Sequence, residues 1–252
     1  MIRTVFMITL WCLSLLVVGP FALMYTFLTR DIRPLYWVGT SLAYYGVRMA
    51  GVKVEVRGLD ALPPRNYIFM SNHVSNLDPP VLIPRLPGRC SVLVKSELFR
   101  IPILGTAMRM AELVPVERNN REAAIESVRA AAVVMQHGLN MVIFPEGTRS
   151  MDGGLLPFKK GPFHLAMKTG VPVVPVTILG TAECWPKGTW AMRPGTATLI
   201  FHPAIDPEGF SHRDTLLTAV RNAIASALPE DKRGHDSAAS EATKMKSRLS
   251  ET

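Results

Sequence analysis

Residues 66–80 read NYIFMSNHVSNLDPP, and residues 140–150 read NMVIFPEGTRS. Each stretch opens with a short apolar run typical of a buried strand and then becomes polar around proline or glycine. Between them, residues 119–135 carry apolar side chains at helical spacing after an Asn that can begin a helix. A strand, a helix and a second strand in this order predict a layered α/β domain.

The same alternation continues on both sides of these two stretches. We predict further strands at 53–57, 91–94, 113–116, 171–178 and 196–201, and further helices at 160–168 and 211–228. The run 171–178 is unusual because Pro172 and Pro175 are incompatible with an ordinary central strand. The predicted fold is therefore an α/β sheet flanked by helices over residues 51–229, a length that suits one domain.

The N-terminal 50 residues differ from the rest. Residues 4–29 form a run of 26 residues without a formal charge. As a helix this run would be about 39 Å long, against roughly 30 Å for the hydrocarbon core of a bilayer. Pro20 is expected to kink or end the helix near Gly19. A second uncharged stretch, 35–47, contains aromatic residues suited to the lipid–water boundary.

Residues 1–50 are therefore predicted to be a membrane anchor of two apolar helices. Either 4–29 crosses the bilayer, or both helices dip into one leaflet. A cleaved signal peptide is disfavoured, because the run is longer than the apolar region of an ordinary signal peptide and no cleavage site is evident after it. Lys and Arg are denser after the run than before it, which places the body of a spanning protein on the cytosolic side of an inner, cytoplasmic membrane.

The amino-acid composition and net charge limit the classes of molecule that this protein is expected to bind. Lys and Arg exceed Asp and Glu by 28 to 20, giving a net charge of +8, while 48% of residues are hydrophobic. This combination indicates an anionic membrane surface or an anionic substrate. Nucleic acid is disfavoured because no basic helix or basic–aromatic ladder occurs. Residues 230–252 lack an apolar period, carry five positive and five negative side chains, and are predicted to be a disordered tail.

The first candidate for chemistry follows the strand at 66–70. His73 is expected at the carboxyl end of that strand, where α/β folds place their sites. Histidine is the usual general base near neutral pH. Across a turn tightened by Pro79 and Pro80, Asp78 could accept a hydrogen bond from the far ring nitrogen and fix the tautomer. The alternative is a loop histidine whose turn is merely capped by Asp78.

The second candidate, residues 144–150, also follows a buried strand. Arg149 offers a planar fork of donors suited to phosphate or carboxylate. The backbone N–H groups of Gly147 and Thr148 could face an anion or a developing oxyanion. Glu146 completes the polar cluster. The alternative is a solvated turn with a Glu–Arg pair. The three cysteines are widely spaced, and no metal-ligand cluster is evident, so no metal site is predicted.

Taken together, these motifs resemble those of the glycerophospholipid acyltransferase family, and most closely its 1-acyl-sn-glycerol-3-phosphate acyltransferases. The family's blocks are matched over roughly residues 50–205 by the H-x4-D spacing of His73 and Asp78, by Arg118 after 114–117, by FPEGTRS at 144–150 and by VPVVPV at 171–176. The resemblance implies the glycerol-3-phosphate acyltransferase-like α/β fold, and it accounts for the two prolines of the last block.

The resemblance also implies a reaction. An acyl chain would pass from a thioester, acyl-CoA or acyl carrier protein, to the sn-2 hydroxyl of lysophosphatidic acid, giving phosphatidic acid at the membrane. His73, oriented by Asp78, would be the general base, with no acyl-enzyme. Backbone N–H groups near Gly147 would stabilise the oxyanion. No cofactor is implied, since the acyl thioester is a substrate.

The remaining polar residues would bind the acceptor. Arg118 and Arg149 are the expected phosphate ligands, and Glu146 would orient Arg149 or the glycerol hydroxyl. Lys95 is a further candidate, although a solvated surface charge is equally consistent. Three alternatives stay open: another acceptor such as a lyso-ornithine lipid or other lysophospholipid, a lipid hydrolase, and a non-enzymatic membrane- or nucleic-acid-binding module.

Overall fold

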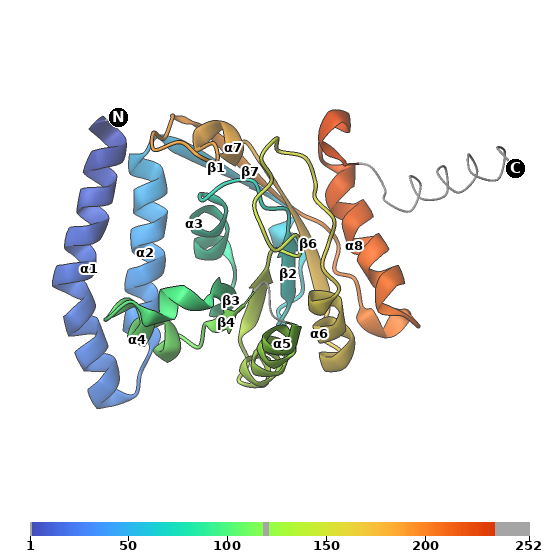
Figure 1. The fold of residues 1–252 in the computed structure, drawn as a ribbon, viewed down its shortest axis with the longest axis horizontal. Helices are drawn as coiled ribbons and strands as arrows, with labels where there is room; N and C mark the ends of the chain where they lie inside the picture. Colours follow the sequence, from blue (N-terminus) through green and yellow to red (C-terminus); the bar gives the residue numbers. More distant parts are fainter. Residues whose placement is uncertain (1, 118–120, 235–252) are drawn as a thin grey trace, which may run out of the picture.

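A computed structural model describes residues 2–117 and 121–234 (Figure 1). Its sheet contains seven strands: β1 (Val52–Arg57), β2 (Ile68–Ser71), β3 (Cys90–Lys95), β4 (Val114–Val116), β5 (Asn140–Ile143), β6 (Val173–Leu179) and β7 (Gly195–Phe201). The spatial order is β1-β7-β6-β2-β5-β3-β4. Every neighbouring pair is parallel except β6 and β7. The predicted α/β sheet is confirmed, and each predicted strand matches one of these strands within a few residues.

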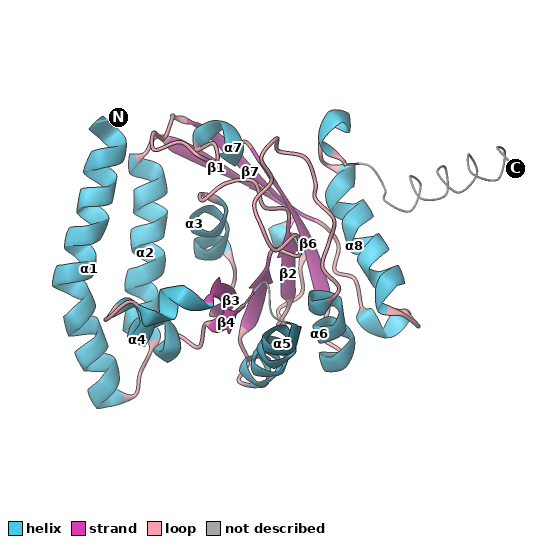
Figure 2. Ribbon diagram, viewed as in Figure 1, coloured by secondary structure: helices cyan, strands magenta, loops and turns pink. Residues whose placement is uncertain are grey.

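Helices cover both faces of the sheet (Figure 2). They are α1 (Ile2–Thr29), α2 (Arg33–Met49), α3 (Asp78–Leu82), α4 (Leu104–Met110), α5 (Arg121–Gln136), α6 (Gly161–Thr169), α7 (Thr181–Cys184) and α8 (Arg213–Ser226). Successive side chains of a strand point to opposite faces. In β2, Phe69 accordingly joins the core beside α2 and α3, while Ile68 and Met70 join the core beside α5, α6 and α8.

The proline-containing strand corrects one expectation. Strand β6 lies inside the sheet, between β7 and β2, and Pro175 is paired with Met70. The antiparallel ladder with β7 begins only at Val176, and the Pro175 carbonyl accepts a hydrogen bond from His202 N at 3.0 Å. The missing proline N–H therefore falls at the end of this ladder, where it interrupts nothing.

The two N-terminal helices lie side by side as an antiparallel pair (Figure 1). Of the two expected effects of Pro20, a kink or an end, the end is wrong, because helix α1 continues through Pro20 to Thr29. Apolar helices tolerate proline better than soluble ones do. One segment of α1, Thr4–Thr29, is long and apolar enough to cross a membrane, and only 7% of an apolar 18-residue window within it is buried. Val47 and Ala50, from α2 and the residue after it, reach the core of the α/β domain.

The C-terminal boundary also shifts. Residues 230–234 were expected to begin a disordered tail, but Glu230–Lys232 form a short 3₁₀ helix. The Lys232 carbonyl accepts a hydrogen bond from Leu155 N at 2.9 Å, and its ammonium group donates to the Asp152 carbonyl. These contacts fasten the segment to the loop after β5. The rest of the predicted tail, 235–252, lies outside the described residues.

Candidate active site

The carboxyl ends of parallel strands lie at one edge of the sheet. The strands β2, β5, β3, β4 and β6 run in the same direction, and the segments that follow them therefore meet at this edge. His73 follows β2, and residues 144–150 follow β5. The sequence-predicted candidates are thus brought together by strand direction, although 73 residues separate His73 from Glu146.

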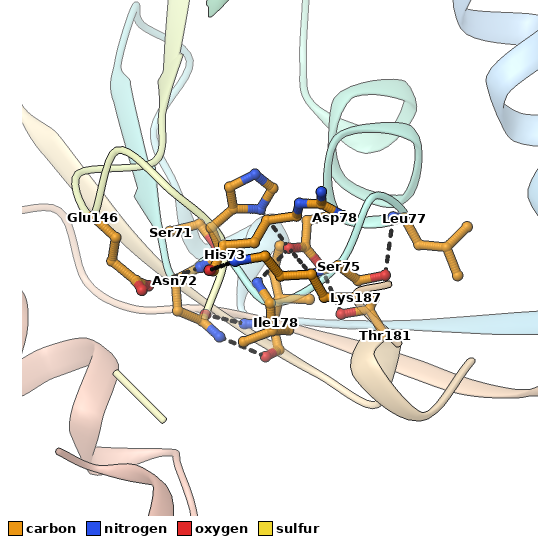
Figure 3. Close-up of polar contacts among 12 residues, drawn as sticks. Ser71, Asn72, His73, Ser75, Leu77, Asp78, Glu146, Ile178, Thr181 and Lys187 are labelled. Atoms are coloured by element: carbon orange, nitrogen blue, oxygen red, sulfur yellow. Dashed lines mark hydrogen bonds and ion pairs between the residues drawn. The ribbon is translucent and has the colours of Figure 1, made fainter. Parts of the chain in front are cut away.

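The predicted pairing of His73 with Asp78 is present (Figure 3). The His73 Nδ1 atom lies 2.7 Å from Asp78 Oδ2, and the Asp78 side chain is completely buried. The aspartate accepts further hydrogen bonds from Val74 N (2.7 Å), Ser75 N (2.8 Å) and the Thr181 hydroxyl (2.6 Å). Buried carboxylates are stable only when they are well hydrogen-bonded, and these donors meet that requirement.

The His73 ring is held on one side by this bond and on one face by Phe144. The two ring centroids are 4.2 Å apart and nearly parallel. The His73 side chain is 12% exposed. Its Nε2 atom makes no hydrogen bond to any residue that the structure describes, whereas Nδ1 is bonded to Asp78. Nε2 is therefore the nitrogen available to a substrate.

Glu146 joins the two motifs through the backbone. Its carboxylate accepts hydrogen bonds from His73 N at 2.8 Å and from Leu156 N at 3.2 Å. Ser150 N donates to the His73 carbonyl at 2.8 Å. Burial raises the Glu146 pKa to about 7, against the opposing effect of the two backbone donors. Among the described residues the Glu146 carboxylate bonds to these backbone groups and not to Arg149, while its other expected role, orienting the glycerol hydroxyl, stays a prediction.

Two residues that sequence reasoning missed connect the site to β6. The Asn72 amide donates to the Ile178 carbonyl at 2.9 Å and accepts from Ile178 N at 2.8 Å. Thr181 follows β6 and donates to Asp78. Gly180 has a φ of +80°, and a Cβ there would lie 2.0 Å from the Thr196 carbonyl oxygen. The glycine after the proline-containing strand was the one available clue, since it marks a close backbone approach.

Gly147 makes the turn after β5. Its φ is +69°, and its N–H donates to the Phe144 carbonyl at 3.0 Å. This N–H is committed to the turn, so the expectation that it faces an oxyanion is wrong. The Thr148 N–H makes no such bond within the described residues. Lys159 lies against the turn, because a Cβ on Gly147 would be 2.7 Å from its Cε.

The predicted phosphate ligands have different environments. The Arg149 guanidinium makes no hydrogen bond or ion pair with the described residues, while its carbonyl accepts from Lys187 Nζ at 2.7 Å. Lys95 ends β3 at the same sheet edge and pairs with Glu97 at 2.9 Å, with both side chains about half exposed. Arg118 lies outside the described residues, directly after Glu117. Arg149 is therefore the described arginine best placed to bind an anion.

An apolar cavity opens beside the site. Its volume is about 160 Å³, and it lies between β5, α5 and α6. Phe144 and Gly147 line it near the histidine, and Val128, Ala131 and Leu165 line it further in. The described residues hold no group of three or more His, Cys, Asp or Glu side chains able to bind a metal.

Comparison with known proteins identifies this architecture. A family model described as "Acyltransferase" matches residues 53–179, and the chain belongs to this acyltransferase family. Within the family it is similar to the 1-acyl-sn-glycerophosphate acyltransferase PlsC of Thermotoga maritima. The TM-score to that crystal structure is 0.76 at 32% identity, over 88% of this chain and 92% of that one.

Curated relatives are similar over a shorter part of their length. A 1-acyl-sn-glycerol-3-phosphate acyltransferase of Limnanthes alba is 36% identical over 64% of this chain and 57% of its own. The chloroplastic BAT2 form of Brassica napus is 37% identical over 70% and 51%, respectively. The human alpha form is 33% identical over 71% and 65%. The chain thus spans between half and two thirds of these relatives.

Proposed function

We propose that this protein transfers an acyl chain from an acyl thioester to the sn-2 hydroxyl of 1-acylglycerol 3-phosphate, giving phosphatidic acid. The observation that carries the proposal is the buried His73–Asp78 pair, whose free Nε2 lies beside the residues that follow β5. The substrate is taken from the relatives, whose names describe this activity.

The proposed chemistry begins at His73 Nε2, which removes the proton of the acceptor hydroxyl as its oxygen attacks the thioester carbonyl. Asp78 holds the Nδ1–H and stabilises the imidazolium. A carbon–oxygen bond forms, the tetrahedral intermediate collapses, and the carbon–sulfur bond breaks. His73 then returns its proton to the departing thiolate. No group on the enzyme carries the acyl chain.

The charges that develop need partners. The Thr148 N–H and the Lys159 ammonium lie at the turn after β5 and are candidate donors to the tetrahedral oxyanion. Arg149, with Arg118 after β4, would bind the acceptor phosphate bidentately. The cavity beside Phe144 would accept apolar chain, because apolar walls exclude water from acyl groups.

Membrane attachment through α1 completes the proposal. Most of the exposed side chains that the structure describes on this helix are apolar. The Thr4 hydroxyl accepts a hydrogen bond from Met192 N at 2.9 Å, so the first turn of α1 stays beside the α/β domain. A helix crossing the bilayer would place that turn on the far side. The contact therefore favours insertion of α1 in one leaflet, and we propose that the active site faces the cytosol.

An acceptor and donor panel tests the function. The full-length protein in membranes is given labelled acyl-CoA or acyl carrier protein with lysophosphatidic acid, other lysophospholipids or a lyso-ornithine lipid. We expect labelled phosphatidic acid from lysophosphatidic acid, and its loss in His73→Ala. Rapid turnover of another acceptor without lysophosphatidic acid turnover would overturn the substrate, and release of free fatty acid alone would indicate a hydrolase.

A further inference from the structure

The loop between α7 and β7, residues 185–194, exposes a tryptophan. Trp190 is 85% exposed, the largest fraction among the large hydrophobic side chains that the structure describes outside its gaps. Tryptophan is usually well buried in soluble proteins, because its large ring gains much from leaving water. A tryptophan this exposed is therefore a candidate contact residue.

Hydrogen bonds hold this loop in one shape. The Trp185 indole N–H donates to the Thr189 carbonyl at 2.9 Å, and Arg193 N donates to the Cys184 carbonyl at 2.7 Å. These bonds brace the loop on both sides of Trp190. Trp190 is therefore exposed on a loop whose backbone is held in place by hydrogen bonds.

The loop joins the active site to the apolar helix α1. On the site side, the Trp185 carbonyl accepts from the Ser75 hydroxyl at 2.8 Å, and Lys187 donates to the Arg149 carbonyl. On the other side, Met192 N donates to Thr4 of α1. In Figure 1 the loop extends from α7 toward the upper end of the helix pair. Trp190 thus lies on the segment that connects the catalytic residues with the candidate membrane helix.

The charge of the loop matches one partner. Residues 185–194 contain Lys187 and Arg193 and no acidic residue, and Arg193 is exposed. Tryptophan is enriched where lipid headgroups meet hydrocarbon, and neighbouring cations are attracted to anionic lipid. Together with its attachment to α1, this pattern points to a bilayer surface.

We propose that the Trp190 loop is a second membrane contact, which inserts its indole at the headgroup level of an anionic bilayer beside the active site. The inference deepens the proposed function, because it rests on a membrane-borne acceptor. The contact would hold the site against the surface from which a lysolipid enters, while α1 provides the main anchorage.

Fluorescence tests the contact without requiring activity. The full chain is bound to vesicles of phosphatidylcholine and phosphatidylglycerol whose acyl chains carry bromine at a shallow or a deep position. The emission of Trp190 is taken as the difference between wild type and Trp190→Phe. We expect a blue-shifted emission that shallow bromine quenches more than deep bromine. Emission at the wavelength of water-exposed indole, without quenching, would overturn the proposal.

Kinetics provides the second arm. Trp190→Ala should raise the KM for lysophosphatidic acid in anionic vesicles, and Arg193→Ala should raise it about fivefold, an effect that salt screens. Neither should change kcat for a monomeric short-chain acceptor. Ile125→Ala, an equally apolar change at an exposed position of α5, is the control.

The outcomes separate the two proposals. If neither acceptor is turned over by the wild type, the proposed function fails, while the bromine experiment still decides on the loop. A different result would be that Trp190→Ala raises the KM for an acyl carrier protein donor while bromine does not quench Trp190 in the wild type. In that case the loop is a protein-binding surface and the membrane contact is wrong.

Discussion

The residues that the structure describes include two histidine–carboxylate pairs with nearly equal contact distances. His73 Nδ1 lies 2.7 Å from Asp78 at the carboxyl edge of the sheet, and His137 Nδ1 lies 2.6 Å from Glu112 where α4 and α5 end. The first pair has side chains that are 12% and 0% exposed, whereas the second has 58% and 28%. The contact distance alone therefore does not define a catalytic pair.

The surroundings make the difference. Apart from His73, the described donors to Asp78 are neutral, two backbone N–H groups and a hydroxyl, so no described cation competes with His73 for the carboxylate. Glu112 also binds Arg89 at 3.0 Å. Burial raises the Glu112 pKa, but the hydrogen bonds from His137 and Arg89 outweigh burial and lower it. Since water screens an exposed pair, the second pair is suited to surface stabilisation.

The largest expected effect separates the two histidines. His73→Ala should lower the rate of acyl transfer by about 10²–10⁴-fold, because it removes the proposed general base. His137→Ala removes an equally short contact and should leave the rate within about twofold. Initial rates with labelled acyl thioester, with circular dichroism as a folding control, measure both. Equal losses in the two variants would contradict the distinction.

The next effect concerns the buried carboxylate that joins the motifs. Glu146 has a pKa near 7 in the folded protein against 4.5 as its ordinary value. The folded state therefore binds more protons between these pH values, and stability falls as pH rises from 4.5 to 7. The span corresponds to about 3 kcal/mol. Denaturant unfolding against pH should show this slope in the wild type and not in Glu146→Gln. An unchanged slope in the variant would refute the assignment.

A smaller effect tests the residue behind Asp78. Thr181→Val removes the hydroxyl donor to a buried carboxylate, and the rate should fall about 10- to 150-fold, since such bonds contribute roughly 1.5–3 kcal/mol. The pH–rate profile should also shift, because the Thr181 hydroxyl supports the carboxylate that holds His73. Thr181→Ser should restore both.

Thr177→Val is the matched control for this change. Thr177 is also completely buried, but its hydroxyl lies 2.8 Å from His202 and donates to the Ile224 carbonyl at 2.9 Å. We expect lower stability with an unshifted profile. A pH shift in Thr177→Val, or none in Thr181→Val, would show that the effect is general loosening of the fold.

The smallest expected effect is that of changing the exposed His137–Glu112 pair. Glu112→Gln should reduce the free energy of unfolding by about 1 kcal/mol or less, because partly exposed ion pairs contribute little. The acyl-transfer rate should not change. Denaturant unfolding and the standard assay measure the two quantities. A large rate loss in this variant would place the second pair in the active site.

These two pairs also show how far sequence reasoning reaches. Strand periodicity and turn residues predicted every strand, and parallel strand direction then brought His73 and residues 144–150 to one edge. The five-residue spacing to Asp78 could be interpreted because the turn is local. The contact between His137 and Glu112 could not, since it depends on how α4 and α5 end against each other.

The residues that sequence reasoning missed were missed for a similar reason, because their contacts also depend on three-dimensional packing. Thr181 reaches Asp78 only because β6 lies next to β2. The order of strands in a sheet cannot be predicted from the hydrophobic periodicity of the sequence. Glu146 was expected to orient Arg149 or the glycerol hydroxyl, but its carboxylate accepts hydrogen bonds from the backbone N–H groups of His73 and Leu156. Local patterns therefore identified the residues of the site, while their partners required the three-dimensional packing.

The central claim is that Asp78 orients the His73 ring and stabilises its imidazolium form during acyl transfer. Its most direct test is the rate of phosphatidic acid formation by Asp78→Asn, in protein whose fold is verified by circular dichroism. The asparagine amide favours the wrong imidazole tautomer, and we predict a rate about 10⁴-fold lower with little change in KM. A rate within tenfold of the wild type would contradict the account.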